Sequence, residues 1–368
     1  MDFCGTSAQD ELSALGRRIL SDRVTPGRLA ELEQAGVGID ERLWAELASA
    51  GILSAALPAQ AGGDGYGLAE QCSILIEAGR VLAPVPYLES IVLGAGVIAR
   101  FGSPDQVARY AAKAAAGELV IAPALAEPGC DDLGTPGTRA EPCAGGWVLS
   151  GAKTSVQAGA SAGLFLVTAA TQLGTGVFCV EPGDHGLTVR PQQLLTGPGA
   201  ALLSLADVEL PPGRLVGSPD GEAARWLTAR ATVGLCAYQL GVTERALELT
   251  AEYARTRQQF GRAIGAFQAV AQRLADAFID VDAIRLTMWQ AAWRLENHLL
   301  ADAEIATAKF WAAEAGHRVA HTAVHVHGGV GIDISHPVHR YFAAAKRTEF
   351  ALGGATSQLR RLGAMLAG

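Results

Sequence analysis

Hydrophobic positions toward the C-terminus recur with the 3.6-residue period of a helix, and this pattern predicts four long helices. We expect them over residues 222–256, 266–299, 301–326 and 336–366. Four helices of this length are enough for a bundle. The chain from residue 8 to about residue 119 is also helical in pattern, and Pro84 and Pro86 interrupt it.

The pattern changes between residues 120 and 215, where the apolar runs become short or alternating. These runs are 147–151, 164–167, 177–180, 187–189 and 202–210. Glycine, proline, aspartate and serine separate them, as in a small antiparallel sheet or barrel. The order of helices, strands and helices predicts an α+β chain, with domains at 1–119, 120–215 and 216–368.

Composition narrows the class of protein. A chain of 368 residues can bury a large core, and its net charge is -8 without a basic block. Nucleic acid and anionic membranes are therefore not expected partners. The six cysteines are scattered without a CxxC pair, which favours reduced thiols over disulfides. No apolar run reaches the roughly 18–20 residues of a membrane span, and no signal peptide is visible, so we expect a cytoplasmic protein.

The stretch Tyr253–Gln268 carries candidate binding chemistry at a predicted helix end. Arg257 and Gln259 lie beside Phe260 and Gly261, where the helical period stops. A guanidinium suits a phosphate oxygen, and an aromatic ring can lie against a planar group. A solvated arginine at a helix C-terminus explains the same residues, so both interpretations stay open here.

The sequence R-x-x-F-G followed by I-G-x-F-Q resembles a turn of the acyl-CoA dehydrogenase family, flavoproteins that desaturate acyl-CoA thioesters. In that family the turn crosses a dimer interface and holds the AMP half of the FAD bound to the neighbouring subunit. The resemblance implies FAD contacts from Arg257, Gln259, Phe260, Gly261, Phe267 and Gln268. It covers essentially the whole chain, and implies an N-terminal helical domain, a middle β domain and a C-terminal four-helix bundle.

His317, His321 and His325 follow one another at four-residue intervals and so share a helix face. A zinc motif of the HExxH type places a glutamate inside such a set, and none is present, so we expect no metal site. The stretch HVHGGVG instead resembles the family's Q-x-x-G-G-x-G turn, with histidine in place of glutamine. The FAD contacts implied there are His325, Val326, His327, Gly328 and Gly329.

In this family a glutamate removes the α-proton of the thioester while the β-hydride passes to the flavin. That glutamate usually begins an E-G-T-x-Q motif, which the stretch GATSQ from Gly354 resembles. Thr356 and Gln358 fit the motif and are implied FAD contacts. Gly354 stands at the base position and has no side chain that could take a proton. A minority of members place the base earlier, near Arg230 or Ala231 here, and neither is a carboxylate.

Two flavin-ring segments are also altered. The family's T-E-P-G-x-G-S-D resembles residues 126–132, AEPGCDD, which are one residue shorter and lack the threonine. The family's K-x-W-I-T-N resembles residues 153–158, KTSVQA, which lack the tryptophan that covers the flavin. Four longer runs resemble the base-lacking member of the heteromeric α2β2 enzymes with which actinobacteria shorten sterol side chains. These runs are GWVLSGAKT, AEYARTRQQFGRAIGAFQAVAQRLAD, FWAAEAGHRVAHTAVHVHGGVGID and EFALGGATSQLRRL.

This resemblance implies that a second subunit supplies the catalytic glutamate and the flavin-ring pocket. It also implies a steroid side-chain acyl-CoA substrate and an electron acceptor such as an electron-transfer flavoprotein. Two alternatives stay open. One is a homo-oligomeric dehydrogenase in which Glu349, five residues before Gly354, is a relocated base, although that offset on a helix points away from the usual direction. The other is a flavin-free scaffold subunit, against which the retained Arg257 and Phe260 count.

Overall fold

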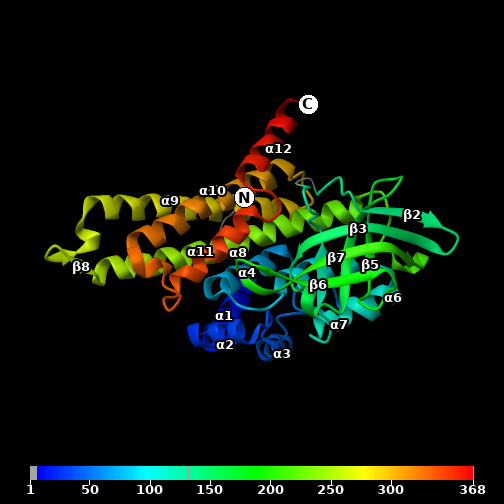
Figure 1. Ribbon diagram of the computed structural model, residues 1–368, viewed down its shortest axis with the longest axis horizontal. Coiled ribbons are helices and arrows are strands. Elements are labelled where there is room, and N and C mark those ends of the chain that lie inside the picture. The colour runs from blue at the N-terminus through cyan, green and yellow to red at the C-terminus, as the bar shows by residue number, and fades with distance from the viewer. Residues whose placement is uncertain (1–5, 131–132, 368) are drawn as a thin grey trace. The chain divides into compact units, whose positions relative to one another are not determined.

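The computed structural model describes residues 6–130 and 133–367 (Figure 1). Within them the chain forms two compact units. One, which we call the helical unit, consists of residues 6–26, 72–83 and 232–367. The other, the sheet unit, consists of residues 27–71 and 84–231. No helix of the described residues has an apolar stretch long enough to cross a membrane.

Three long helices dominate the helical unit and confirm the ranges that the period predicted. They are α8 (Glu222–Thr256), which enters the unit at residue 232, α9 (Gln268–Glu296) and α10 (Asp302–His327). The single helix expected over 336–366 is wrong: the structure has α11 (Val338–Phe350) and α12 (Ala355–Ala367). Leu352 and Gly353, with φ of 59° and 91°, adopt the left-handed conformation that ends a helix.

Small residues allow the helices of this unit to approach closely. A Cβ on Gly79 of α4 (Leu68–Val81) would lie 2.2 Å from the Tyr238 carbonyl oxygen of α8. A Cβ on Gly241 would lie 1.9 Å from the Ile76 carbonyl oxygen. The core shared with α10 and α11 is rich in alanine: Val242, Ala246, Ala320, Ala323, Val338, Tyr341, Ala344 and Ala345. At the N-terminus, Arg17 of α1 (Ser7–Arg23) forms an ion pair with the buried Glu77.

Seven strands form one sheet in the sheet unit. They are β1 (Ile121–Ala124), β2 (Arg139–Cys143), β3 (Gly146–Val156), β4 (Leu164–Ala170), β5 (Thr175–Val180), β6 (Leu187–Leu194) and β7 (Gly197–Leu210). Their order is β1-β4-β2-β3-β7-β6, with β5 beside β4. Most pairs are antiparallel, but β1 and β2 each pair with β4 in parallel. The expectation of an antiparallel sheet is therefore wrong at β4, which is buried along nearly its whole length, as parallel strands usually are.

The remaining helices of the sheet unit are short: α2 (Pro26–Ala35), α3 (Glu41–Ser49), α5 (Gly96–Phe101), α6 (Pro104–Gln106) and α7 (Ala112–Ala115). Two segments, η2 (Tyr87–Ala95) and η3 (Val107–Ala111), are π-helices. The buried Ser90 of η2 accepts a hydrogen bond of 3.0 Å from the Ile121 N–H, which fixes the start of β1. The core of the sheet includes Leu149, Phe165, Val167, Phe178, Leu203 and Val208.

Candidate cofactor-binding site

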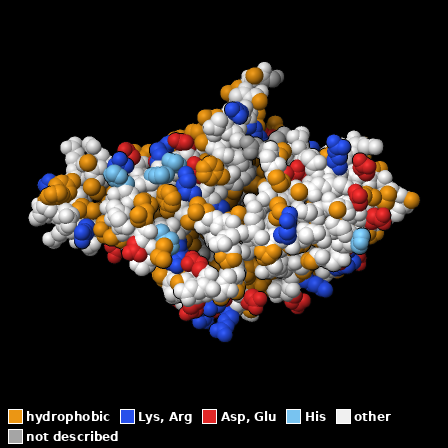
Figure 2. Space-filling model, viewed as in Figure 1, with side chains coloured by type: hydrophobic (Ala, Val, Ile, Leu, Met, Phe, Trp, Pro, Cys, Tyr) orange, Lys and Arg blue, Asp and Glu red, His pale blue; other side chains and the backbone are white. Residues whose placement is uncertain are grey.

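The turn after α8 is a hairpin with an exposed tip. Strands β8 (Gln258–Gln259) and β9 (Arg262–Ala263) pair around Phe260 and Gly261, whose φ angles are 52° and 79°. Two positive φ angles are typical of the tight hairpin turn that favours glycine and asparagine, so phenylalanine is strained there. Phe260 is nevertheless 92% exposed. Figure 2 shows hydrophobic side chains at the surface of this end of the helical unit. A strained and exposed aromatic ring is suited to binding rather than to core packing.

Arg257 connects α8 to this hairpin. Its N–H donates to the Tyr253 carbonyl oxygen at 2.8 Å, and its own carbonyl oxygen accepts from the Ile264 N–H at 2.8 Å. Its side chain is exposed, and its guanidinium has no carboxylate partner among the described residues. The backbone therefore fixes Arg257 while its charge stays available to an anion. Gln259 and Gln268 are exposed as well.

Arg262 was missed in the sequence. Its guanidinium carbon lies 4.2 Å from the centroid of the Phe267 ring, a cation–π contact. Phe267 also meets Phe260 edge to face, with centroids 6.1 Å apart. The hairpin therefore presents a second cation beside two aromatic rings. The sequence feature that could have identified Arg262 is its position directly after Gly261. In the hairpin register it lies opposite Gln259.

The second predicted turn follows the end of α10 and forms the short helix η7 (Gly328–Ile332). Gly328 has φ 62° and ψ -137°, a conformation open only to glycine. A Cβ added at Gly328 or Gly329 would meet no atom within 4 Å, so the backbone there is uncovered. His325 is exposed, whereas Val326 and His327 are buried in the helical unit. Only part of this predicted group can therefore touch a ligand directly.

The structure brings the two turns together through Tyr253 and His327. Their rings stack with centroids 4.3 Å apart and an interplanar angle of 22°. The Nδ1 of His327 lies 2.8 Å from the Ala323 carbonyl oxygen, so Nδ1 carries the proton. Burial lowers the pKa of His327, which favours the neutral ring. Its Nε2 is buried without a hydrogen-bond partner among the described residues.

The third predicted group lies at the break between α11 and α12. Thr356 is exposed, but Gln358 is only 5% exposed. The Gln358 Nε2 donates to the carbonyl oxygens of Leu352 and Gly353 at 3.2 and 3.3 Å. Gln358 therefore stabilises the break from inside, and only Thr356 is open to a ligand.

Gly354 lies in the same break. A Cβ there would lie 3.5 Å from the Glu349 carbonyl oxygen, an ordinary contact distance, so a side chain would fit. Glu349 is near the end of α11 and does not share a helix with Gly354, which corrects the assumption of one continuous helix. Its carboxylate is 15% exposed and lies 2.6 Å from Lys346 Nζ and 3.1 Å from His317 Nδ1. Glu349 is thus a paired carboxylate.

The earlier base position holds no proton acceptor either. Ala231 is 1% exposed. The guanidinium carbon of Arg230 lies 4.2 Å from the centroid of the Trp226 ring. Both residues therefore contribute packing, and neither can remove a proton as a carboxylate would.

The two altered flavin-ring segments are neighbours in the sheet unit. The Thr154 N–H donates to the Ala126 carbonyl oxygen at 2.9 Å. Glu127 lies 2.6 Å from the fully buried Lys153 Nζ and accepts from the Thr138 N–H at 2.9 Å. Burial opposes ionisation of Glu127, but these hydrogen bonds prevail and hold its pKa below the usual value. Asp131 and Asp132 lie outside the described residues.

At the position expected for the flavin-covering tryptophan, Ser155 has φ 53°. Its N–H donates to Gln192 Oε1 at 2.8 Å. Glu127, Lys153 and the Ser155 N–H therefore have hydrogen-bond partners within the protein. The chemistry of the two turns is compatible with FAD, since they expose a cation, an aromatic ring and bare backbone. Glu127, Lys153 and the Ser155 N–H of the other two segments are instead paired within the chain.

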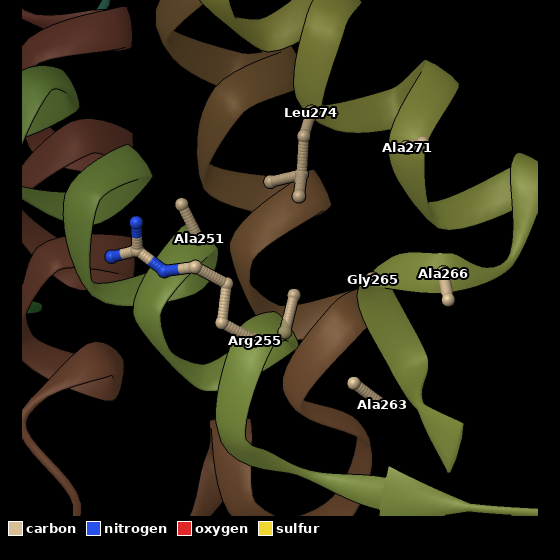
Figure 3. Close-up of a pocket in the computed structure, with 8 residues that line it drawn as sticks. Ala251, Arg255, Ala263, Gly265, Ala266, Ala271 and Leu274 are labelled. Carbon is tan, nitrogen blue, oxygen red and sulfur yellow. The ribbon is translucent and has the colours of Figure 1, made fainter.

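An open pocket of about 350 Å³ lies beside the hairpin (Figure 3). Its lining consists of Ala251, Ala254, Arg255, Ala263, Gly265, Ala266, Ala271 and Leu274. The Arg255 guanidinium points away from Ala263 and Ala266. Alanine and glycine form most of the pocket wall, so the pocket is mainly apolar. In the part of the chain that the structure describes, no group of three or more His, Cys, Asp or Glu residues is placed to bind a metal ion.

Comparisons with known proteins identify the family of this chain. Residues 6–118 match the family description "Acyl-CoA dehydrogenase, N-terminal domain", and residues 222–367 match "Acyl-CoA dehydrogenase, C-terminal domain". Acyl-CoA dehydrogenase FadE27 of Mycobacterium tuberculosis is 49% identical over an alignment of 376 positions, which covers 100% of this chain and 99% of that protein.

Two solved structures are similar over nearly the whole chain. A chain of the ChsE4-ChsE5 complex from Mycobacterium tuberculosis has a TM-score of 0.95 and 49% identity, with 100% of this chain and 99% of that chain covered. A chain of the Tcur3481-Tcur3483 steroid ACAD G363A variant has a TM-score of 0.92 and 40% identity. The match covers 98% of this chain and 97% of that chain. These matches confirm the fold that the sequence resemblance implied. The chain therefore belongs to the acyl-CoA dehydrogenase family, whose cofactor is FAD.

Proposed function

We propose that this chain is the base-lacking subunit of a heteromeric, FAD-dependent acyl-CoA dehydrogenase that desaturates an acyl-CoA thioester. The observation that carries the proposal is the glycine at position 354, where most members of the family have the catalytic glutamate. A glycine cannot accept the α-proton. The nearby Glu349 is already paired with Lys346 and His317. A partner subunit then supplies the catalytic base.

The proposed contribution of this chain is to hold the AMP half of the FAD bound to that partner. Bound FAD supplies the hydride acceptor, and the protein supplies position and charge. Arg257 offers a guanidinium to a phosphate, and Phe260 offers a ring to a planar group. The bare backbone at Gly328 and Gly329 allows a close approach of the dinucleotide.

The flavin-ring segments support the division of labour between subunits. Glu127 and Lys153 pair with each other, and Gln192 holds the Ser155 N–H. These groups are used inside the chain and are poorly suited to cradle an isoalloxazine ring. We infer that the ring lies against the partner's residues instead.

The similarity to the ChsE4-ChsE5 complex and to a steroid ACAD supports two finer proposals. The first is that the partner is a second acyl-CoA dehydrogenase subunit that carries the missing glutamate. The second is that the substrate is a steroid side-chain CoA ester. We further propose that electrons leave through an acceptor such as an electron-transfer flavoprotein.

A self-sufficient enzyme with Glu349 as its base is the second candidate. Its specific support is that Glu349 is the carboxylate nearest in sequence before Gly354. The ion pair with Lys346 and the separate helices of Glu349 and Gly354 weigh against it.

Flavin content and acyl-CoA oxidation of the chain, purified alone and with its co-purifying dehydrogenase partner, test the proposal. We expect little FAD and no activity in the chain alone, and a flavin-replete active complex. A flavin-replete homo-oligomer that oxidises acyl-CoA would contradict the proposal and support the self-sufficient enzyme. If the partner subunit alone is flavin-replete and fully active, this chain is a scaffold subunit.

A further inference from the structure

We propose that Tyr253 and His327 are positioning residues, which set the spacing between the two turns that hold the AMP half of FAD. This inference rests on the proposed function and extends it from the exposed contacts to the residues behind them. Neither side chain has to touch the cofactor.

Tyr253 is tied directly to the first turn. It lies in the last turn of α8, and its carbonyl oxygen accepts the Arg257 N–H at 2.8 Å. Arg257 in turn closes the base of the hairpin through Ile264. A displacement of Tyr253 therefore moves the Arg257 backbone, and with it the guanidinium and the hairpin tip.

His327 is tied in the same way to the second turn. It is the last residue of α10, and Gly328 follows it with a φ of 62°, which favours glycine. The His327 side chain is 4% exposed, and Nδ1 holds the Ala323 carbonyl oxygen one helical turn earlier. Its ring orientation is thus fixed from within α10.

The stack joins these two helix ends. The rings lie 4.3 Å apart and are nearly parallel at 22°. Stacked aromatic side chains have a preferred separation, so the pair acts as a spacer of defined thickness. The ring of His336 also lies near His327, with centroids 5.0 Å apart at 53°. His327 therefore contacts one ring from α8 and one from the segment before α11, and its own Nδ1 fixes its orientation on α10.

A spacer of this kind is important because both turns must contact the same ligand at the same time. A cofactor-binding geometry that is displaced by about 1 Å loses much of its interaction energy. An aliphatic residue in place of either ring would fill the core but would not preserve the separation. When a positioning residue is lost, the residue that it positions contributes less to the binding free energy of the ligand.

The experiment is FAD titration into the apo complex with the partner subunit, combined with a double-mutant cycle between Tyr253→Leu and Arg257→Ala. We expect Tyr253→Leu to raise the Kd for FAD about tenfold, and Tyr253→Phe, which keeps the ring, to leave it within about twofold. In the Tyr253→Leu background, Arg257→Ala should weaken binding by much less than it does alone. His327→Leu removes the same stack from α10 and should give the same result, so it carries the test if Tyr253→Leu does not fold.

Phe310→Leu is the matched control, because Phe310 is a half-buried aromatic residue of α10 that contacts Trp311 instead of the turns. It should leave the Kd unchanged. Additive effects of Tyr253→Leu and Arg257→Ala would overturn the positioning role, as would a Phe310→Leu effect of equal size. If Arg257→Ala weakens binding and Tyr253→Leu does not, only this inference fails. If Arg257→Ala has no effect, the proposed function fails with it.

A second measurement needs no partner. In the isolated chain, amide hydrogen exchange of residues 254–267 and 324–338 should accelerate together in Tyr253→Leu and in His327→Leu. Acceleration in only the segment that carries the substitution would show that the two turns are not coupled through the stack.

Discussion

Glu349 and Lys346 form an ion pair at the end of α11, with Nζ 2.6 Å from Oε2. Both side chains are largely buried, at 15% and 17% exposure, and His317 Nδ1 lies 3.1 Å from the same carboxylate. Figure 2 shows histidine side chains at the surface of the helical unit. The pairing gives Glu349 a structural explanation that does not require catalysis.

Glu349→Gln is therefore expected to leave the kcat of the complex within about twofold, because the amide can keep a hydrogen bond to Lys346. A catalytic base at this position would instead show a loss of roughly 10²–10⁴-fold. Steady-state acyl-CoA oxidation by the purified complex checks this. A loss in that range with unchanged assembly would revive the relocated base.

Gly354→Glu is expected to fold normally and to remain inactive in the isolated chain. The site accommodates a Cβ, but general base catalysis requires a substrate and flavin that are already placed. Gly353→Ala is the control: its φ of 91° disfavours any side chain, and the variant should lose about 1–2 kcal/mol of stability. Thermal unfolding measures the stability of both variants, and a flavin-reduction assay measures the activity of Gly354→Glu. Turnover by Gly354→Glu without a partner would show that a working pocket had survived.

Arg257→Ala is expected to weaken FAD binding by the complex about ten- to a hundredfold, since a charge-assisted hydrogen bond contributes roughly 1.5–3 kcal/mol. Arg257→Lys should retain only part of the FAD affinity, because an ammonium lacks the planar fork of a guanidinium. Arg255→Ala is the matched control: Arg255 is exposed in the last turn of α8, and its guanidinium points away from the turn residue Ala263 (Figure 3). FAD titrations that gave equal dissociation constants for all four proteins would identify Arg257 as an ordinary solvated helix-end arginine.

Glu127→Gln is expected to destabilise the sheet unit by about 3–5 kcal/mol, because it removes the negative charge that balances the fully buried Lys153. The double variant Glu127→Gln/Lys153→Met should recover much of this loss. Glu141→Gln, on the exposed side of β2, is a suitable control. Urea unfolding midpoints provide the comparison, and a midpoint for Glu127→Gln equal to that of the control would rule out a structural role of the pair.

The buried Lys309 is expected to make the stability of the folded chain depend on pH. It is fully buried and donates to the carbonyl oxygens of Thr348 and Glu349, and burial lowers its pKa to about 8. The unfolded chain keeps this proton to higher pH than the folded chain, so the cost of burying the charge is present at pH 7 and is relieved above about pH 8. Relative to Lys309→Met, the unfolding free energy should rise by roughly 1 kcal/mol between pH 7 and pH 9. A flat or falling difference would contradict the lowered pKa.

Hydrophobic periodicity by itself determined α8, α9 and α10 and the strand runs of β3 to β7, because period is a local property that each segment carries alone. Residue identity alone determined that position 354 lacks a proton acceptor. The motif residues Arg257, Phe260 and Gly328 could also be named without coordinates, since the turn chemistry lies within a few consecutive residues.

Only the tertiary structure decided how these pieces meet. The parallel pairing of β1 with β4 joins strands about 40 residues apart, and no local pattern encodes such a choice. Gln358 belongs to a recognisable motif, yet packing turns its amide inward to the break that Leu352 begins. The contact between Tyr253 and His327 depends on where two long helices end in space, which the period of neither helix specifies. Sequence spacing describes single elements, whereas contacts between distant elements follow from how their side chains pack.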